Sequence, residues 1–259
     1  MGRDPVGFVD IHSHVLYGLD DGAKTLDDSV EMLRIAAAAG TTDIVATPHA
    51  NGQYRFDPAV IDQRIAELAS HSDVRIHRGC DFHLQPDNIL DALAHPDKYT
   101  VNGQAYLMLE LPEMTISPNT DEILLRLLDA GIVPIITHPE RNRPLQRRLD
   151  DLAQWVESGC YLQVTAGSCT GRFGKAAQAC ADALMRRGLV HFIASDAHDS
   201  KHRPPTLQPA YEALASIWGE DAIHPLFDDN PRAVLTGDTI EYEFQPQQAP
   251  RRKWYQFWR

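Results

Sequence analysis

The sequence predicts an α/β fold in which parallel strands curl into a (β/α) barrel or a near-barrel. Short β-branched or apolar runs alternate with helical patterns along the chain, and no repeat or low-complexity insert breaks the series. Seven such units are enough to curl a sheet. The length of 259 residues also agrees with single barrels of roughly 250 residues. A doubly wound open sheet is the alternative architecture.

Each predicted strand is a short run of β-branched or apolar residues. Because a helical segment separates each run from the next, the strands should be parallel and joined by right-handed crossovers. The seven runs are Val6–Ile11, Asp43–Thr47, Val74–Cys80, Ala105–Leu109, Ile132–Thr137, Tyr161–Thr165 and Val190–Ser195.

Helices are predicted between these strands from their start and stop signals and their apolar faces. Leu26–Ala39 has an Asp-rich first turn and ends before Gly40. Asp121–Ala130 ends before Gly131 and has one apolar face. The residues of that face are Ile123, Leu124, Leu127 and Leu128.

Composition narrows the functional classes. Hydrophobic residues make up 43 % of the chain and charged residues 23 %, which is typical of a folded globular protein. A net charge of −12 disfavours non-specific binding of nucleic acid, which clustered Lys and Arg would recruit. The four cysteines form no CxxC pair, so free thiols in a reducing compartment are expected.

The sequence also predicts a cytoplasmic location. No apolar run approaches the ~20 residues that span a bilayer. The first ten residues, MGRDPVGFVD, lack the apolar core of a signal peptide.

Imidazoles and carboxylates lie at the ends of six of the seven predicted strands. In a parallel barrel these ends open onto one face, where barrel enzymes have their active sites. Each residue alone has an ordinary structural interpretation, such as a helix cap or a packed loop histidine. Independent structural histidines, however, would be scattered along the strands. The residues in question are His12, His14, His49, Asp81, Glu110, His138, Asp196 and His198.

We interpret the other seven histidines as structural, although one of them, His83, lies on the same side of its strand as Asp81. With Asp21 from the first loop, the set contains five imidazoles and four carboxylates, more than one mononuclear site uses. Two or three divalent ions would use them, and at least one carboxylate must then bridge. These ligands without thiolate suit Mn²⁺, Fe or Zn²⁺ better than Cu(I). We expect Mn²⁺, with Fe or Zn²⁺ as alternatives.

The motifs DIHSH…DDG, TPH, GCD, LEL, THPERN and ASDAH, in this order over residues 10–203, resemble those of the polymerase and histidinol phosphatase (PHP) superfamily. Within it, DDG, ERN and the RPP after the last histidine resemble the bacterial capsule-type metal-dependent protein-tyrosine phosphatases. The resemblance implies a single-domain, distorted seven-stranded (β/α) barrel with a trinuclear metal site. It also implies hydrolysis of phosphotyrosine in proteins, in the regulation of a tyrosine kinase of capsule or exopolysaccharide synthesis.

A ligand assignment follows from the same resemblance. The first metal would be surrounded by His12, His14 and Asp196, the second by Glu110 and His138, and the third by Asp21, His49 and His198. Asp81 would bridge the first two metals, a position where the superfamily usually has Glu. Because Asp is shorter by one methylene, either the strand end lies closer to the metals or these two ions are held less tightly.

Such a site would hydrolyse phosphomonoesters without a thiol. A hydroxide provided by a bridged metal pair can attack phosphorus in line while the ions neutralise the phosphoryl oxygens. The C-x5-R loop of thiol-based phosphatases is not recognisable around any of the four cysteines. We predict that Arg141 and Arg203, which follow strand-end ligands, hold the phosphate. The alternative is a surface ion pair, for Arg141 with Glu140.

The loop ANGQYRFDP, residues 50–58, follows His49 and should overhang the site. Its Tyr54, Arg55 and Phe56 would grip a phosphotyrosine ring and an acidic neighbour, or form an ordinary packed loop.

Three other functions stay open. One is a phosphatase of a small metabolite such as histidinol phosphate, with the same fold and metals. The second is an amidohydrolase-like C–N hydrolase, although that class commonly bridges its metals through a modified lysine and no predicted strand here ends in Lys. The third is a non-catalytic metal-binding docking module of a polysaccharide assembly complex.

The chain is predicted to divide into a phosphatase domain, residues 1–244, and a linker with a basic, aromatic tail, residues 245–259. The last nine residues, RRKWYQFWR, carry four cations, four aromatic residues and no acid. This composition suits an anionic membrane surface or an acidic partner, and the alternatives are a tail folded back on the barrel or a frayed end. We therefore expect peripheral contact with the inner face of the membrane, near a membrane-bound tyrosine kinase.

Overall fold

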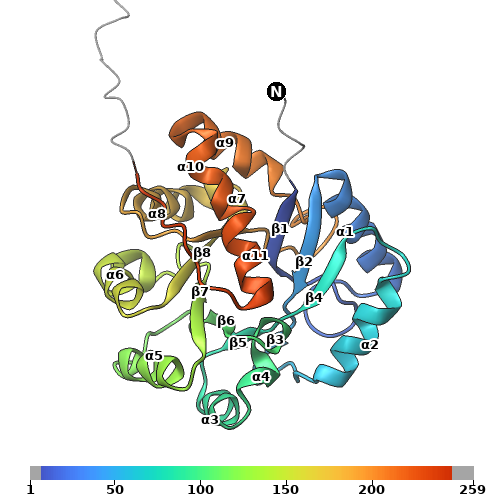
Figure 1. The fold of residues 1–259 in the computed structure, drawn as a ribbon, viewed down its shortest axis with the longest axis horizontal. Helices are drawn as coiled ribbons and strands as arrows, with labels where there is room; N and C mark the ends of the chain where they lie inside the picture. Colours follow the sequence, from blue (N-terminus) through green and yellow to red (C-terminus); the bar gives the residue numbers. More distant parts are fainter. Residues whose placement is uncertain (1–6, 247–259) are drawn as a thin grey trace, which may run out of the picture.

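Two parallel sheets form the centre of the molecule (Figure 1). The computed structural model describes residues 7–246, and within them there are nine strands. One sheet has the order β1-β2-β4 and the other the order β3-β5-β6-β7-β8-β9. The strands are β1 Phe8–Ser13, β2 Thr41–Ala46, β3 His49–Ala50, β4 Arg75–Arg78, β5 Asp81–His83, β6 Tyr106–Glu110, β7 Val133–Thr137, β8 Tyr161–Thr165 and β9 Phe192–Ala194.

Helices follow the strands and surround the sheets (Figure 1). The predicted helix Leu26–Ala39 is confirmed as α1 (Leu26–Ala38), which begins with a capping box between Thr25 and Asp28. The predicted helix Asp121–Ala130 is confirmed as α5 (Thr120–Asp129). The other helices are α2 Pro58–Leu68, α3 Pro86–Ala94, α4 Pro96–Tyr99, η1 Val101–Gly103, η2 Leu145–Arg147, α6 Leu149–Glu157, α7 Ala166–Cys169, α8 Gly174–Arg186, α9 Gln208–Trp218, α10 Glu220–Ile223, η3 His224–Leu226 and α11 Asp229–Thr236.

Two short strands, β3 and β5, were not predicted, so the described part of the chain has nine strands and not the expected seven. The second predicted strand, Asp43–Thr47, is confirmed as β2, and β3 begins after Pro48. Pro48 has no N–H to donate to a neighbouring strand, which favours a break there. The third predicted strand, Val74–Cys80, is confirmed as β4, and β5 begins directly after Cys80. The N–H of Asp81 donates to the carbonyl of Pro48 at 3.2 Å, so β3 and β5 are aligned.

The two unpredicted strands change where the predicted ligands lie. His49 and Asp81, expected at the ends of strands, instead begin β3 and β5. The first strand begins at Phe8 and runs to Ser13, so His12 lies within it. Val6, the predicted start of that strand, lies outside the described residues. The other predicted strands agree with β6, β7, β8 and β9 to within two residues at each end.

Alternate residues of the strands enter two separate hydrophobic clusters. Leu107 and Leu109 of β6 belong to the larger cluster, which includes the apolar faces of the outer helices. Tyr106 and Met108 of the same strand belong to the smaller cluster, together with Ile11 and residues of other strands. A strand has this period of two, and burial of both faces is typical of parallel sheets covered by helices.

The N-terminal ends of the strands are covered by α11 and η1. The Tyr106 hydroxyl donates to the carbonyl of Asp238 at 2.7 Å. The side-chain amide of Asn102 donates to the carbonyl of Leu235 at 3.0 Å. Figure 1 shows α11 lying across the strands at this end. We therefore expect a site at the opposite, C-terminal end, where parallel (β/α) folds have theirs.

At that opposite end the first strand meets the segment after the last. Ser13 forms an isolated parallel bridge with Ala197. The N–H of His14 donates to the carbonyl of Ala197 at 2.8 Å, and the N–H of Asp196 donates to the carbonyl of His12 at 2.9 Å. The first and last ligand motifs of the sequence are therefore adjacent.

The described chain stays packed up to its C-terminal end. Phe244 is buried, and its ring lies 5.5 Å from that of Trp218. The predicted tail lies outside the described residues, except for its first two, Gln245 and Pro246. Among residues 7–246, no helix combines the length and the apolar character needed to cross a bilayer.

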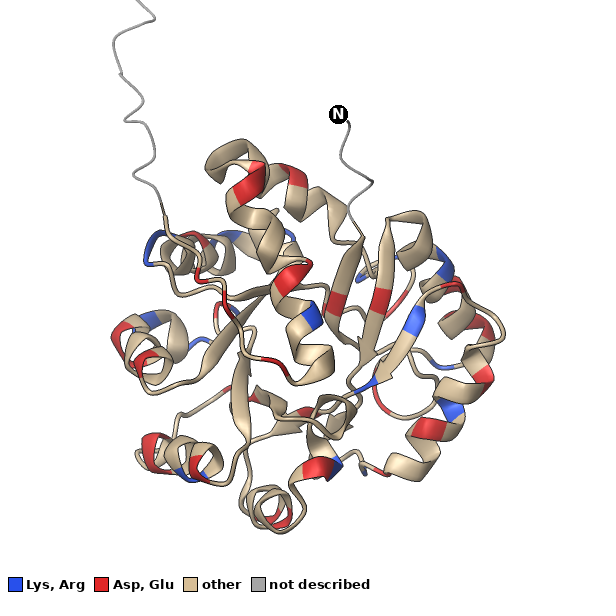
Figure 2. Ribbon diagram, in the orientation of Figure 1, with Lys and Arg blue, Asp and Glu red and all other residues tan. Residues whose placement is uncertain are grey.

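A buried carboxylate links the two strands β2 and β4 to the C-terminal helix. Asp43 accepts hydrogen bonds from Arg75 at 2.6 and 2.7 Å and lies 2.9 Å from the His77 ring and 3.4 Å from Arg232. In Figure 2 an acidic segment of β2 and basic segments of β4 and α11 are seen in the same part of the molecule. Burial alone would raise the pKa of Asp43, but His77 and Arg75 lower it below its ordinary value.

We expect Asp43→Asn to lower the free energy of unfolding by about 2 kcal/mol at pH 7. Because the folded-state pKa is depressed, the carboxylate stabilises the fold above its unfolded pKa of about 4, and the difference should shrink as the pH falls below that value. Urea unfolding at pH 7 and at about pH 2 measures both effects. Asp62→Asn is the matched control, since Asp62 forms an exposed pair with Arg78. Equal losses in the two variants would contradict the prediction.

Candidate metal centre

The nine predicted ligands lie together, close to the C-terminal ends of β1, β6, β7 and β9 and to the first residues of β3 and β5. They form four overlapping groups, and within each group one candidate ligand atom of every residue lies within 4.8 Å of the others. The groups are His12, His14 and Asp196; His12, Asp81 and His138; His49, Asp81 and Glu110; and His14, Asp21, His49 and His198.

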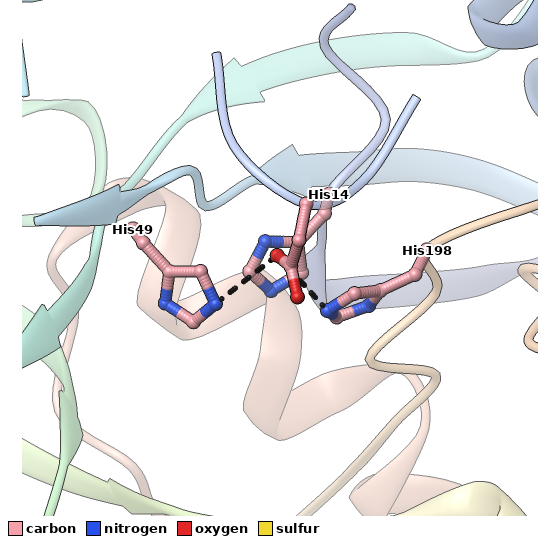
Figure 3. A group of neighbouring side chains, drawn as sticks. His14, His49 and His198 are labelled. Carbon is pink, nitrogen blue, oxygen red and sulfur yellow. Dashed lines mark ion pairs between the residues drawn. The ribbon is translucent and has the colours of Figure 1, made fainter. Parts of the chain in front are cut away.

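Three imidazoles and one carboxylate form the most open group. Figure 3 shows His14, His49 and His198 turned toward one another from three different segments. The carboxylate of Asp21 lies 3.4 Å from Nε2 of His49 and 3.5 Å from Nε2 of His198. Asp21 is about half exposed, so solvent reaches this side of the cluster.

Asp81 lies at the centre of the cluster and belongs to two groups. Its Oδ2 is 3.4 Å from Nε2 of His12 and 3.3 Å from Nδ1 of His49. Glu110 lies on the far side, 3.6 Å from Nδ1 of His49 and 3.8 Å from Nε2 of His138. A carboxylate shared in this way suits a bridging ligand, although it is the shorter Asp.

The two oxygens of Asp196 face different partners. Oδ1 lies 3.6 Å from His12 and 3.5 Å from His14. Oδ2 accepts hydrogen bonds from Arg141 and from Arg203, the latter at 2.5 Å. Asp196 also has a φ of 51°, in the left-handed region that non-glycine residues rarely adopt. Backbone strain of this kind is concentrated at functional sites.

Three further side chains contact the ligands and were not predicted as site residues. Asp20 lies 2.7 Å from Nδ1 of His14, and the Gln163 side-chain oxygen lies 3.0 Å from Nδ1 of His12. His83, interpreted as structural, lies 3.1 Å from Glu110. Such contacts fix which ring nitrogen of a histidine faces the ligand side.

The turn that carries Asp20 approaches His14 closely. The N–H of Gly22 donates to Asp20 at 2.9 Å, and that of His49 donates to it at 3.2 Å. A Cβ at position 22 would lie 2.1 Å from the carbonyl oxygen of His14, so only glycine fits there. This explains the glycine in the DDG motif.

Electrostatics leaves two of the imidazoles neutral. Burial lowers the pKa of His138 to about 3, with Arg141 acting in the same direction. Burial likewise lowers the pKa of His198 to about 3, assisted by the charge of His14. A neutral imidazole offers a lone pair, the form that binds a metal ion.

The pKa values of two other groups are shifted in the direction of their charged forms. Burial disfavours the charge on His14, but Asp20 raises the pKa of His14 well above its ordinary value. Burial also opposes the charge on Asp196, yet His12 and the other cations hold the pKa of this carboxyl well below its usual range. The cluster thus combines anionic oxygens with imidazoles.

Several buried polar atoms of the cluster lack a hydrogen-bond partner among the described residues. They include both carboxylate oxygens of Asp81, Nε2 of His12, Nε2 of His14 and Nδ1 of His49. An unpaired buried polar atom costs about 1–3 kcal/mol, so such atoms are rarely left together. Cations among these oxygen and nitrogen atoms would satisfy them. The donor set therefore fits divalent metal ions.

The two predicted arginines lie beside this cluster. Both contact Asp196, and their side chains are about one quarter exposed, so they face the open side of the site. Glu140, the alternative partner of Arg141, is buried and accepts hydrogen bonds from the Ser168 hydroxyl and the Thr165 N–H. The interpretation of Arg141 as a surface ion pair with Glu140 is therefore wrong.

The loop after His49 reaches the site through one aromatic residue. The ring of Tyr54 lies 5.9 Å from that of His49, and the two planes differ by only 14°. Phe56, by contrast, is buried against Tyr99 and points into the core. The Arg55 side chain is 90 % exposed. Tyr54 is thus the residue of this loop that overhangs the candidate centre.

Comparison with known proteins connects this geometry to one family. Residues 8–236 match the family model described as "Capsular polysaccharide synthesis, CpsB/CapC". The tyrosine-protein phosphatase YwqE of Bacillus subtilis is 34 % identical over 255 residues, covering 96 % of this chain and 99 % of YwqE. The putative tyrosine-protein phosphatase CapC of Staphylococcus aureus is 31 % identical over 254 residues, covering 95 % and 98 % of the two chains.

Solved structures agree with these sequence relatives. One comes from a study of Bacillus subtilis YwqE and Streptococcus pneumoniae CpsB, described as unique metal-dependent tyrosine phosphatases. It aligns with a TM-score of 0.84 at 33 % identity, covering 94 % of this chain and all of that one. The phosphotriesterase homology protein of Escherichia coli aligns with a TM-score of 0.59 at 12 % identity, covering 88 % of this chain and 98 % of that one, and this likeness concerns the fold alone.

Proposed function

Because this chain belongs to the CpsB/CapC family of capsular polysaccharide synthesis, we propose that it is a metal-dependent tyrosine-protein phosphatase. The observation that carries this proposal is the cluster of nine ligand side chains, with unpaired buried atoms, beside two arginines. Its substrates would be phosphotyrosine proteins of capsule or exopolysaccharide synthesis.

We further propose that the two sheets together form one distorted seven-stranded barrel of the PHP type. In this view β2 with β3, and β4 with β5, each count as one bent strand. The bridge between Ser13 and Ala197 would then join the first strand to the last.

The proposed ligand sets follow the assignment from the sequence. One ion would be held by His12, His14 and Asp196, a second by Glu110 and His138, and a third by Asp21, His49 and His198, with Asp81 shared by the first two. Two or three divalent ions, Mn²⁺ or else Fe or Zn²⁺, would activate a water molecule and neutralise the phosphoryl oxygens. Asp81 lies in one group with His12 and His138 and in another with Glu110, which supports a bridge between the first two ions.

The arginines would bind the phosphoryl group from the side opposite the metals. Each guanidinium group is planar and can donate two parallel N–H hydrogen bonds to phosphoryl oxygens. Hydrogen bonds to Asp196 hold both guanidinium groups beside the cluster. The phenolate of tyrosine, with a conjugate-acid pKa of about 10, needs little protonation as it leaves. Tyr54 would contact the ring of the substrate above His49.

Hydrolysis of phosphotyrosine peptides, phosphoserine peptides and histidinol phosphate by the purified protein tests this proposal. Preferential release of phosphate from phosphotyrosine would support it. Preference for histidinol phosphate would favour the metabolite phosphatase instead. Bound metal without turnover of any phosphoester would favour the docking module of a polysaccharide assembly complex.

Replacing all four cysteines by Ser should leave turnover of an aryl phosphate within about threefold of wild type, because the attacking oxygen would come from water. Burial raises the pKa of Cys160 to about 12 and that of Cys180 to about 12, and it also raises those of Cys80 and Cys169. These thiols are therefore protonated and weakly nucleophilic at neutral pH. Loss of activity in a variant that still folds and binds metal would refute this mechanism.

We also propose that the basic, aromatic tail brings the enzyme to an anionic membrane surface near a membrane-bound tyrosine kinase. Single cations add about 1 kcal/mol each at such a surface. A chain truncated after Gln248 should keep its turnover of a small aryl phosphate and lose salt-sensitive binding to phosphatidylserine vesicles. Sedimentation with anionic and neutral vesicles measures the effect, and equal sedimentation of both chains with the anionic vesicles would eliminate this role.

A further inference from the structure

β8 is the strand whose predicted end carries no imidazole or carboxylate, and the loop that follows it contacts the arginines instead. Thr165, the last residue of β8, donates its N–H to Glu140 at 3.0 Å, and Ser168 of α7 donates its hydroxyl to the same oxygen at 2.7 Å. Glu140 directly precedes Arg141. The loop after β8 therefore holds the backbone from which Arg141 extends.

The same loop places an aromatic ring against both arginines. Cζ of Arg141 lies 4.3 Å from the centroid of the Phe173 ring, and Cζ of Arg203 lies 5.6 Å from it. Both distances are within the roughly 6 Å range of cation–π attraction. One ring thus contacts two guanidinium groups that come from different segments, one after β7 and one after β9.

The position of this ring is fixed by the backbone beneath it. A Cβ at Gly167 would lie 2.8 Å from Cε2 of Phe173, so the ring packs directly on that glycine. The N–H of Arg172 donates to the Gly167 carbonyl at 2.8 Å and closes the loop around it. The Phe173 ring is therefore held in place and offers a fixed surface on which the longer, more flexible arginine side chains can pack.

Asp196 and Phe173 act on different parts of each guanidinium. Asp196 accepts hydrogen bonds from the N–H edges of Arg141 and Arg203, the edges that a phosphoryl group would also need. A ring face uses no N–H donor. If the N–H groups donate to a phosphate instead of to Asp196, both guanidinium groups can still contact the Phe173 ring.

We propose that Phe173 is a positioning residue for phosphate binding, which holds Arg141 and Arg203 in place while their hydrogen bonds pass from Asp196 to the phosphoryl group. This inference rests on the proposed function, because it takes the two arginines as the phosphate ligands. Without the ring, each long side chain would have to be ordered by the phosphate itself, at a cost in side-chain entropy.

The test is calorimetric binding of inorganic phosphate to the metal-loaded protein. Phe173→Leu and Phe173→Met, two non-aromatic variants, should raise the Kd for phosphate about tenfold, while Phe173→Tyr keeps the ring and should change it less than about twofold. Metal content should stay at the wild-type level. In a chain that already carries Arg141→Ala and Arg203→Ala, Phe173→Leu should add no further loss. Trp218→Leu is the matched control, since Trp218 contacts Arg186 and neither active-site arginine.

The outcomes separate this inference from the proposed function. Wild-type phosphate affinity in both non-aromatic variants, with a loss in the arginine variants, would overturn the role of Phe173 and leave the phosphatase proposal intact. An equal loss in Trp218→Leu, or a further loss in the double-arginine background, would also overturn it. Failure to hydrolyse phosphotyrosine, with phosphate binding that still depends on the ring, would refute the proposed substrate and support the role of Phe173.

Discussion

Removal of divalent metal by a chelator is expected to lower turnover of an aryl phosphate by roughly three orders of magnitude or more, because no other cation in the cluster can activate water. The guanidinium groups of Arg141 and Arg203 can hold a phosphoryl group but do not generate a nucleophile. Release of phosphate after prolonged dialysis against chelator, and again after addition of Mn²⁺, Fe²⁺ or Zn²⁺, measures the effect. The functional metal is the one that restores the highest turnover when it is bound in a stoichiometric ratio to the protein.

A ligand variant links this loss to the cluster. His138→Ala should lower both the metal content and the turnover, since His138 lies within reach of Glu110 and Asp81. His71→Ala, at an exposed position after α2, is the matched control and should change neither. Full activity of the dialysed protein in excess chelator would contradict the proposal of a metal-dependent enzyme.

Replacement of Arg203 by Ala is expected to lower kcat/KM for an aryl phosphate by about 10²-fold while the metal content stays unchanged, since one charged donor to the transferring group is lost. The same change at Arg141 should have a similar effect, because both side chains share the Oδ2 atom of Asp196. Arg→Lys at either position should restore only part of the rate, since an ammonium group lacks the planar fork. Steady-state kinetics with metal analysis of each variant measures this.

Arg143→Ala is the control that separates loss of a nearby positive charge from loss of a phosphate-binding side chain. Arg143 lies two residues from Arg141, is exposed, and forms no ion pair among residues 7–246. Arg143→Ala should change kcat/KM for a small aryl phosphate by less than about threefold. Wild-type kinetics in both Arg141→Ala and Arg203→Ala would show that the phosphate is bound elsewhere.

The helices α1 and α5 and most strands could be predicted because their signals are local. The acidic first turn of α1 and the glycines after α1 and α5 lie within a few residues of the ends that they mark. The short strands β3 and β5 could not be predicted, since two or three residues are too few to show the period-two pattern of a strand. Pro48 marks the end of the strand before β3, but it does not indicate that pairing resumes after it.

The candidate ligands could be predicted for a similar reason, but their supporting contacts could not. Parallel strands bring their C-terminal ends together whatever their order, so His12, Glu110 and His138 needed no contact information. The pairing of His12 with Gln163 joins positions 151 residues apart, and no period in the sequence encodes it. A polar Gln inside the buried run YLQVT was the available hint. The DDG motif places Asp20 directly beside the predicted ligand Asp21, so the motif offered a signal for Asp20 as well.

The division of the strands into two sheets has a consequence for how cation affinity and fold stability depend on each other. His12 belongs to the three-stranded sheet, whereas Asp81 belongs to the six-stranded one and His138 directly follows β7 of that sheet. The two ions held by His12 and by His138, with Asp81 shared between them, would connect the two sheets. Their measured affinity would then include the free energy of keeping the sheets in contact. A substitution far from the ligands that weakens the contact between the sheets would therefore also weaken metal binding.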